Sequence, residues 1–285
     1  RYSNNYFGGV INTMLQDNMV AIPIETVTSV KRGTQTYYLG EQITEFSQLA
    51  SGDIQPWRKL EQRFSVPVTI MSFYQGPGTS ISNYKITQTF TYNTSGNLIG
   101  IKDEGGRSIS SIYDYDDKYA VATLINADPI ADKSAYTSFE TSNFGGWILN
   151  GSPLYNNGTG NITGERSFAL SSGINNLTTS GLNAAKPYIV SFWANVAGIT
   201  VSPGATLTKT AAGINGLTFY EYDIAQGATS VTISGTGTID ELRILPKTAR
   251  MRTFTYDPLI GKTSECDENN RITYYEYDNL GRLRF

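Results

Sequence analysis

Short apolar runs that alternate with polar residues are the main pattern along this chain. Over residues 188–196, every second residue is apolar: Tyr188, Val190, Phe192, Ala194 and Val196. A period of two predicts a strand that buries this face and places Trp193 on the opposite face. Further short strands, with glycine and asparagine turns between them, are predicted at Ser138–Glu140, Ser167–Leu170, Thr218–Ile224, Ser230–Ser234 and Thr238–Leu245.

A helical period is confined to two stretches near the start of the sequence. Within Val10–Val20, apolar residues recur at helical spacing, and Pro23 ends the pattern. Residues 41–50 are a second candidate for a short helix. The rest of the chain has the pattern of strands and turns, so the sequence predicts an all-β fold.

A stretch of 25 residues occurs twice. Phe90–Asp114 and Phe254–Asp278 share eight residues when they are aligned without a gap. Each copy contains a five-residue turn, Asp103–Arg107 in the first and Asp267–Arg271 in the second. The third and fourth positions are Gly-Gly in one turn and Asn-Asn in the other, and both residue types tolerate positive φ. We therefore expect the two turns to share one backbone shape, within an antiparallel meander.

The second copy resembles a known family. Residues 277–283 read Tyr-Asp-Asn-Leu-Gly-Arg-Leu, which is similar to the core of the YD repeats of the RHS family. Tyr256-Asp257 and Asn270-Arg271 fit the same repeat, whereas the copy at 92–113 has Asn93 and Asn97 where the core has Asp and Arg. The resemblance implies a large secreted or surface-attached bacterial protein. In complete members, the repeats form a strand spiral around a cavity that holds a separate C-terminal polypeptide.

The two copies are separated by a segment of different composition. Charged residues become sparse there, and Gly, Ser, Thr and Asn dominate between short strands, which is typical of a β-sandwich. We divide the chain into a repeat scaffold at 1–126, an inserted module at 134–247 and the resumed repeats at 250–285. The scaffold is thus predicted to be a YD-repeat meander that is interrupted by a jelly-roll sandwich.

The inserted module also resembles a family. Ser138-Phe139-Glu140 with Gly146-Trp147, the strand at 188–194 and Ile239–Ile244 are similar to the first, central and last strands of galactose-binding-like jelly rolls. Many carbohydrate-binding modules have this fold. The resemblance implies that Glu140 and Asp240 share a structural calcium ion, which favours oxygen ligands. A solvated strand-start acid at Glu140 and a turn acid at Asp240 are the alternative.

Aromatic residues of the module are candidates for glycan contacts. Trp193, Trp147 and Tyr155 could supply a platform on which a sugar ring stacks. Burial between the layers of the sandwich is the alternative, and it is the commoner fate of tryptophan.

Composition excludes several chemistries. The sequence has no histidine and one cysteine, Cys266, so the chain contains no Ser-His-Asp or Cys-His nucleophile, no His-based zinc site and no internal disulfide. The 22 basic and 25 acidic residues give a net charge of −3, which argues against a nucleic-acid partner. The sequence also has no apolar run long enough to span a membrane.

These observations favour a non-catalytic structural and interaction fragment of a large secreted or cell-surface bacterial protein. Both ends look cut, so its own targeting signal is expected to lie elsewhere. Its expected partners are further YD repeats, the enclosed C-terminal segment and glycans. The alternative makes glycan binding the main activity on a repeat stalk, and a third possibility is a glycoside hydrolase that uses Glu221 and Asp223.

Overall fold

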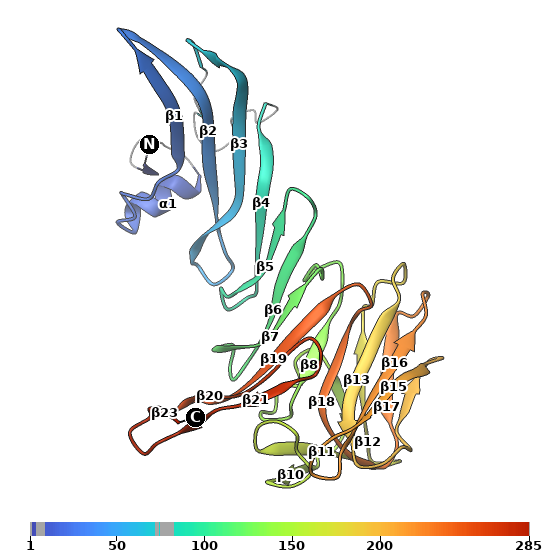
Figure 1. Ribbon diagram of the computed structural model, residues 1–285. Coiled ribbons are helices and arrows are strands. Elements are labelled where there is room, and N and C mark those ends of the chain that lie inside the picture. Colours follow the sequence, from blue (N-terminus) through green and yellow to red (C-terminus); the bar gives the residue numbers. More distant parts are fainter. Residues whose placement is uncertain (1, 4–8, 72–73, 75–82, 285) are drawn as a thin grey trace. The chain divides into compact units, whose positions relative to one another are not determined.

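The computed structural model describes residues 2–3, 9–71, 74 and 83–284. These residues form one helix and 23 strands, so the prediction of an all-β fold is confirmed (Figure 1). Two compact units are present, Arg1–Arg107 and Ser108–Phe285. In the part of the chain that the structure describes, no helix has the length and apolar character needed to span a bilayer.

The first unit is an antiparallel meander with one helix packed on it. Its strands follow one another in chain order: β1 (Glu25–Arg32), β2 (Gln35–Gln48), β3 (Ile54–Val68), β4 (Lys85–Tyr92) and β5 (Leu98–Asp103). Helix α1 (Val10–Gln16) buries Ile11 and Met14 against Ile43 and Leu60 of the sheet. The helix predicted within Val10–Val20 is therefore present, but shorter.

The predicted second helix at 41–50 is wrong. Most of these residues belong to β2, which is hydrogen-bonded to β1 on one side and to β3 on the other. Pairing along both edges of the strand satisfies its backbone N–H and C=O groups, and this outweighs an apolar spacing that could also suit a helix.

The second unit contains a second meander and a large insertion. The meander runs in the order β6 (Ser108–Asp114), β7 (Tyr119–Ile125), β19 (Arg250–Asp257), β20 (Gly261–Cys266) and β21 (Ile272–Tyr274). A hairpin of β22 (Glu276–Tyr277) and β23 (Leu283–Arg284) follows it. Strands β7 and β19 are antiparallel neighbours, and Ile125 is the direct partner of Arg250. The chain thus leaves the sheet and returns at adjacent positions, which is the geometry that an inserted module requires.

The inserted segment is a sandwich-like pair of sheets. Seven strands form one sheet: β8 (Ala135–Thr137), β10 (Tyr155–Asn157), β11 (Arg166–Leu170), β13 (Tyr188–Ala194), β15 (Thr206–Ala212), β16 (Thr218–Ile224) and β18 (Gly237–Pro246). Four strands form the other: β9 (Ile148–Gly151), β12 (Asn175–Ser180), β14 (Thr200–Ser202) and β17 (Ser230–Ser234). The first strand of the segment, β8, pairs with its last, β18, as expected for a module whose two ends meet.

The core of the sandwich comes entirely from residues 135–244. The alternation is confirmed along β13, because Tyr188, Val190, Phe192 and Ala194 all lie in this core. Val196, which was predicted on the same buried face, lies beyond the end of β13 and is 38% exposed. Phe219 of β16 packs with Trp193 in a separate cluster on the other face of the sheet. The predicted strand at Ser138–Glu140 is displaced: β8 ends at Thr137, and Phe139 has a φ of 64°.

One five-residue turn recurs in both meanders. It is found at Asn93–Asn97, Asp103–Arg107, Asp267–Arg271 and Asp278–Arg282. In each, the N–H of the first residue donates to the C=O of the fifth, and the N–H of the fourth donates to the C=O of the first. The side-chain oxygen of the first residue accepts the N–H of the fifth. The shared backbone shape predicted for the two turns of the repeat is therefore confirmed.

The fourth position of this turn needs a left-handed backbone. Its φ is 83° at Gly96, 79° at Gly106, 62° at Asn270 and 71° at Gly281. Glycine and asparagine are the residues that adopt this conformation most readily. The same main-chain turn occurs at Leu49–Asp53, where the first side chain has no acceptor.

We predict that residues 134–247 fold without the meander, because their apolar core contains no residue from outside this range. When the segment is expressed alone, it should be soluble and unfold in one cooperative transition by circular dichroism. The full chain serves as the reference. An aggregated or unfolded product would show that the sandwich depends on the strands that flank it.

Candidate functional site

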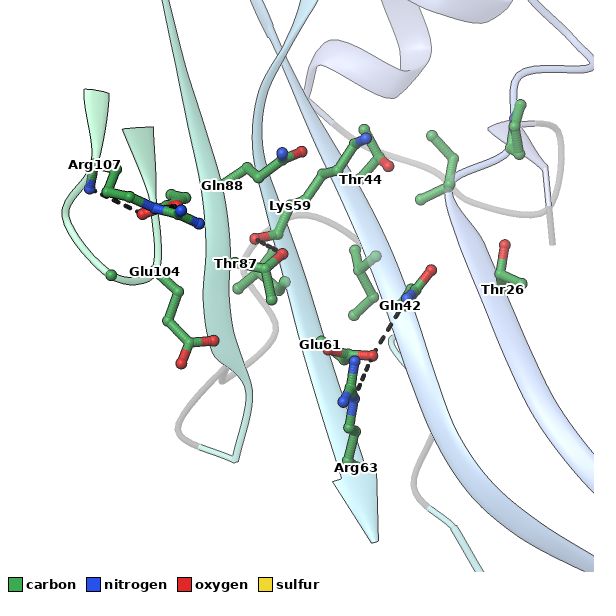
Figure 2. A pocket seen from close by; sticks show the side chains of 16 residues that line it. Thr26, Gln42, Thr44, Lys59, Glu61, Arg63, Thr87, Gln88, Glu104 and Arg107 are labelled. Carbon is green, nitrogen blue, oxygen red and sulfur yellow. Dashed lines mark hydrogen bonds and ion pairs between the residues drawn. The ribbon is translucent and has the colours of Figure 1, made fainter. Parts of the chain in front are cut away.

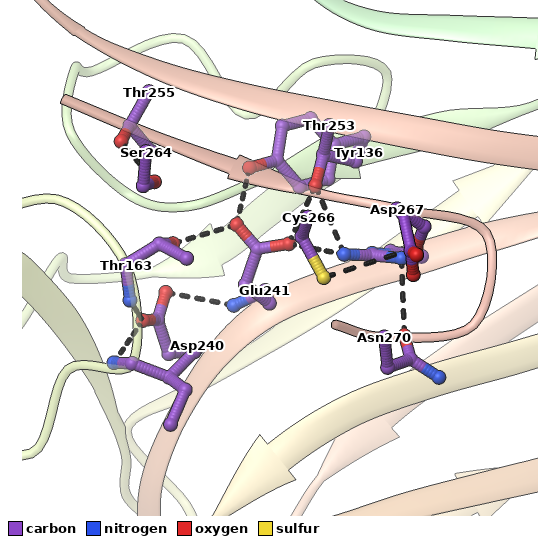
Figure 3. Close-up of polar contacts among 12 residues, drawn as sticks. Tyr136, Thr163, Asp240, Glu241, Thr253, Thr255, Ser264, Cys266, Asp267 and Asn270 are labelled. Carbon is purple, nitrogen blue, oxygen red and sulfur yellow. Dashed lines mark hydrogen bonds and ion pairs between the residues drawn. The ribbon is translucent and has the colours of Figure 1, made fainter. Parts of the chain in front are cut away.

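A buried polar network joins the sandwich to the second meander. Its centre is Glu241 on β18, whose Oε1 accepts hydrogen bonds from the Tyr136 hydroxyl (2.5 Å) and the Thr163 hydroxyl (2.6 Å). Its Oε2 accepts from Arg243 Nη2 (2.6 Å) and from the Thr253 hydroxyl (2.8 Å). Figure 3 shows Tyr136, Thr163 and Thr253 gathered around Glu241. Four donors satisfy one buried carboxylate, which removes most of the cost of burying its charge.

Arg243 extends the network to the resumed repeats. It lies on β18, is 4% exposed, and donates to the Thr253 hydroxyl (2.9 Å) and to Asn270 Oδ1 (3.2 Å). Thr253 belongs to β19 and Asn270 to the recurring turn that follows β20. Arg243 therefore connects β18 to β19 and to the turn after β20.

The single cysteine lies beside this network, and its thiol is unreactive at neutral pH. Cys266 is buried, and burial raises the pKa of its thiol to about 11. At neutral pH the thiol is protonated, so it lacks the thiolate that a nucleophile or a metal ligand requires.

The two predicted calcium ligands hold the same chain segment. Asp240 Oδ2 accepts the backbone N–H groups of Ile162 (2.6 Å) and Thr163 (3.0 Å). Glu140 Oε1 accepts those of Glu165 (3.0 Å) and Arg166 (2.9 Å). The structure therefore brings both acids to residues 162–166, as anchors for that segment.

A calcium ion does not fit this arrangement of donors. Calcium is held by carboxylate and carbonyl oxygens, but here all four carboxylate oxygens of Glu140 and Asp240 accept backbone N–H groups, Asp240 Oδ1 from Glu241 (2.7 Å). Among the residues that the structure describes, no group of three or more Cys, Asp or Glu residues could hold a metal ion. The geometry favours the anchoring role, and calcium binding stays a prediction that can be tested.

Glu140 titrates near neutrality. Burial raises its pKa from the ordinary 4.5 to about 7, against the opposing effect of the N–H bonds from Arg166 and Glu165. Burial, followed by the charge of Glu241, also raises the pKa of Asp240. The anchors of residues 162–166 are therefore the acids that are most costly to ionise in this region.

Both tryptophans proposed as glycan contacts are buried. Trp193 is 7% exposed and packs on Phe219, with Ile162 and Leu217 in the same cluster and Ile272 of β21 against it. Trp147 is 4% exposed and lies in the sandwich core. Neither ring offers a free face on which a sugar could stack. Alternation correctly placed Trp193 on the face opposite to the core, but that face is covered by segments distant in the sequence.

Tyr155, the third predicted contact, is half-buried at the edge of the sandwich. Its hydroxyl donates to the Thr141 carbonyl (3.5 Å), and the guanidinium of Arg166 lies over its ring at 5.6 Å. The opposite part of the ring packs on Phe168 of the core. The structure does not bring Tyr155 together with either tryptophan into an exposed platform.

A polar groove in the first unit was not found from the sequence. It has a volume of about 600 Å³ and lies over β1–β4 and the Asp103–Arg107 turn. Figure 2 shows Glu61 between Gln42, which donates to it at 3.2 Å, and Arg63, which pairs with it at 2.8 Å. The only signal in the sequence is the polar residue at every second position of β2 and β3, which is common on any exposed sheet face.

Two carboxyl groups of this groove have lowered pKa values. The hydrogen bond from Arg63 lowers the pKa of Glu61, and the backbone and side-chain bonds from Arg107 lower that of Asp103. Neither group is suited to act as a general acid near neutral pH, since that requires a raised pKa. The groove can hold a polar ligand, but it shows no activated group.

The two acids of the proposed glycosidase pair are neighbours on one strand. Glu221 and Asp223 lie on the same strand, β16, and the carboxylate of Asp223 forms an ion pair with Lys247.

No protein-family model and no curated protein matches this chain. The resemblances to the YD repeats and to galactose-binding-like modules therefore rest on the residues named above.

We predict that the Glu241–Arg243 pair is essential for stability. Arg243→Met leaves Glu241 buried without its cation and should lower the free energy of unfolding by about 3–5 kcal/mol. Arg252→Met, which removes a partly exposed cation that pairs with Glu265 and Glu268, should cost much less, because water screens that pair. Urea unfolding measures both. Equal losses for the two variants would contradict the prediction.

We predict a pH dependence that arises from Glu140. Between its ordinary pKa of 4.5 and its folded pKa of about 7, the folded state binds more protons than the unfolded state. The free energy of unfolding should therefore fall by about 3 kcal/mol as the pH rises through this window, and then level off. With chelator present, Glu140→Gln should remove this part of the dependence of the unfolding free energy on pH. Glu165→Gln serves as the control. Stability that rises with pH through Glu140 contradicts the prediction.

The N–H bonds at Glu140 and Asp240 also predict the response to calcium. Melting curves in calcium and in chelator should coincide, because the carboxylate oxygens are already occupied. A bound ion at 100 times its Kd would instead stabilise the fold by about 2.7 kcal/mol. A calcium-dependent rise in melting temperature that Asp240→Asn abolishes would establish the calcium site.

Proposed function

We propose that this chain is a structural and interaction fragment of a large secreted or cell-surface bacterial YD-repeat protein, without catalytic activity of its own. The recurring five-residue turn carries the proposal. Four copies with one hydrogen-bond pattern, in two meanders and the hairpin that follows them, are what a scaffold built from repeats requires.

Each residue type of the repeat has a physical role in this turn. In the copy at 277–283, Asp278 accepts the N–H groups of Leu280 (2.9 Å) and Arg282 (3.0 Å). Arg282 Nε returns to the other oxygen of Asp278 (2.8 Å), and Gly281 supplies the positive φ. Each of these residues of the motif thus stabilises one hairpin turn, which supports a structural role for the repeat.

The tyrosine of the repeat fastens each hairpin to an earlier strand. The Tyr277 hydroxyl donates to the Lys262 carbonyl (2.9 Å), and the Tyr256 hydroxyl donates to the Ala120 carbonyl (3.1 Å). Tyr92 does the same with Pro56 (2.8 Å). Since a single hairpin is marginally stable in water, a bond from every hairpin to its neighbour favours a long, continuous wall.

The chemistry of the side chains supports a non-catalytic role. The sequence has no imidazole, and its one thiol is held protonated. Within the sandwich, the buried tryptophans argue against glycan binding at the sites proposed for them. Interaction surfaces are better sought outside the sandwich core.

Two measurements test the proposal. The chain should show no turnover of a panel of glycans, esters and peptides, and antibodies to it should label intact cells of the producing bacterium or its culture medium. Hydrolysis that is lost in Glu221→Gln or Asp223→Asn would establish an enzyme instead. Detection only inside the cells would contradict the surface role.

A further inference from the structure

A cavity of about 550 Å³ opens where the second meander meets the sandwich. It is lined by the segment between β6 and β7, by residues 141–143 after β8, and by Pro258 and Leu259 of the turn after β19. Sites between two packed modules are common positions for small ligands. None of the residues predicted from the sequence as binding residues lines this cavity.

The segment between β6 and β7 is held in an unusual conformation. Three consecutive residues have a left-handed backbone, with φ of 54° at Tyr115, 58° at Asp116 and 61° at Asp117. Non-glycine residues in this region are strained, and such strain persists only where the surroundings enforce it. The exposed Asp116 side chain is therefore presented from a backbone of fixed shape.

Buried contacts enforce that shape. Asp114 is 6% exposed; one of its oxygens accepts the N–H of Tyr115 (2.6 Å), and both accept the Thr141 hydroxyl (2.7 and 2.9 Å). The Tyr115 hydroxyl donates to the carbonyl of Tyr256 (3.0 Å) and accepts its N–H (3.1 Å). These hydrogen bonds hold the segment between β6 and β7 against Thr141 of the sandwich and Tyr256 of the meander, so the cavity is formed without a ligand.

The rings of Tyr115 and Tyr119 form a rigid part of the lining. The ring of Tyr119 stacks on that of Tyr256 with centroids 4.8 Å apart, and its hydroxyl donates to the Pro258 carbonyl (3.1 Å). Tyr115 meets the ring of Tyr119 edge to face at 5.6 Å. At the rim, the side chain of Leu259 is 97% exposed. Rings and an exposed aliphatic side chain are surfaces on which the C–H face of a sugar can pack.

Free polar groups accompany these apolar surfaces. Asp116 and Ser142 have no hydrogen-bond or ion-pair partner among the residues that the structure describes, and both are exposed. A carboxylate beside an aromatic ring can accept hydrogen bonds from neighbouring hydroxyl groups of a sugar. Three carboxyl groups, Asp114, Asp116 and Asp117, face one cation, Lys118, so an anionic sugar would be repelled.

We propose that this cavity binds a neutral saccharide residue, with Asp116 accepting its hydroxyl groups and Tyr119 packing on its C–H face. The site lies outside the sandwich core and does not depend on the scaffold role of the chain. If no saccharide binds here, the recurring five-residue turn and the Glu241–Arg243 network are unaffected. The saccharide proposal and the scaffold proposal can therefore fail separately.

The test is titration of the full chain with methyl glycosides of glucose, galactose, mannose and N-acetylglucosamine, and with glucuronic acid. At least one neutral glycoside should bind at millimolar concentration or below, by calorimetry or ligand-observed NMR, and glucuronic acid should not. Asp116→Asn should weaken binding about 10-fold, because it removes the charged acceptor while asparagine tolerates the left-handed backbone. Tyr119→Leu should weaken it by a similar factor, about 10-fold.

Glu276→Gln, an exposed acid outside the cavity, is the matched control and should bind as the unaltered chain does. Melting temperatures of all variants verify that they are folded. If no neutral glycoside binds, or if binding is the same in Asp116→Asn and in the control, the proposal is overturned. Preferential binding of glucuronic acid would equally overturn it.

Discussion

The buried ion pair between Glu241 and Arg243 is the interaction on which the second unit depends. Both residues belong to β18, the last strand of the sandwich, yet their partners lie in other elements: Tyr136 on β8, Thr163 between β10 and β11, and Thr253 on β19. Removing two charges from water is costly unless nearly every hydrogen-bonding position is filled. The sandwich and the meander must therefore meet in one arrangement for this network to be satisfied.

Apolar packing reinforces the same junction. Tyr136 donates its hydroxyl to Glu241, and its ring lies in a cluster with Leu124 and Met251 of the meander. The direct pairing of Ile125 with Arg250 keeps the meander continuous although more than a hundred residues intervene. The insertion is thus accommodated without breaking the sheet, because its first and last strands are neighbours.

The recurring turn shows how far a repeat can vary and still fold. Asn93 replaces aspartate and keeps the side-chain acceptor, while the arginine of the motif is absent at Asn97. Asn270 replaces glycine and keeps the positive φ. At Leu49 even the acceptor is missing, but the main-chain bonds remain. The backbone shape is therefore the invariant feature, and the side chains stabilise it to different degrees.

Local chemistry was enough to predict the class of the fold, the shared turns and the buried face of β13. These features depend on neighbours in the sequence: alternation along a strand, or a residue that tolerates positive φ. What covers the opposite face of a strand depends on segments distant in the sequence, so Trp193 could be placed on its face but not recognised as buried. For the same reason, Glu140 and Asp240 were identified as a pair, but only the tertiary structure shows that both carboxylates accept backbone N–H groups of residues 162–166. The tyrosine-lined cavity was invisible in the sequence because its walls come from three separate stretches, which the return of the chain at Arg250 brings together.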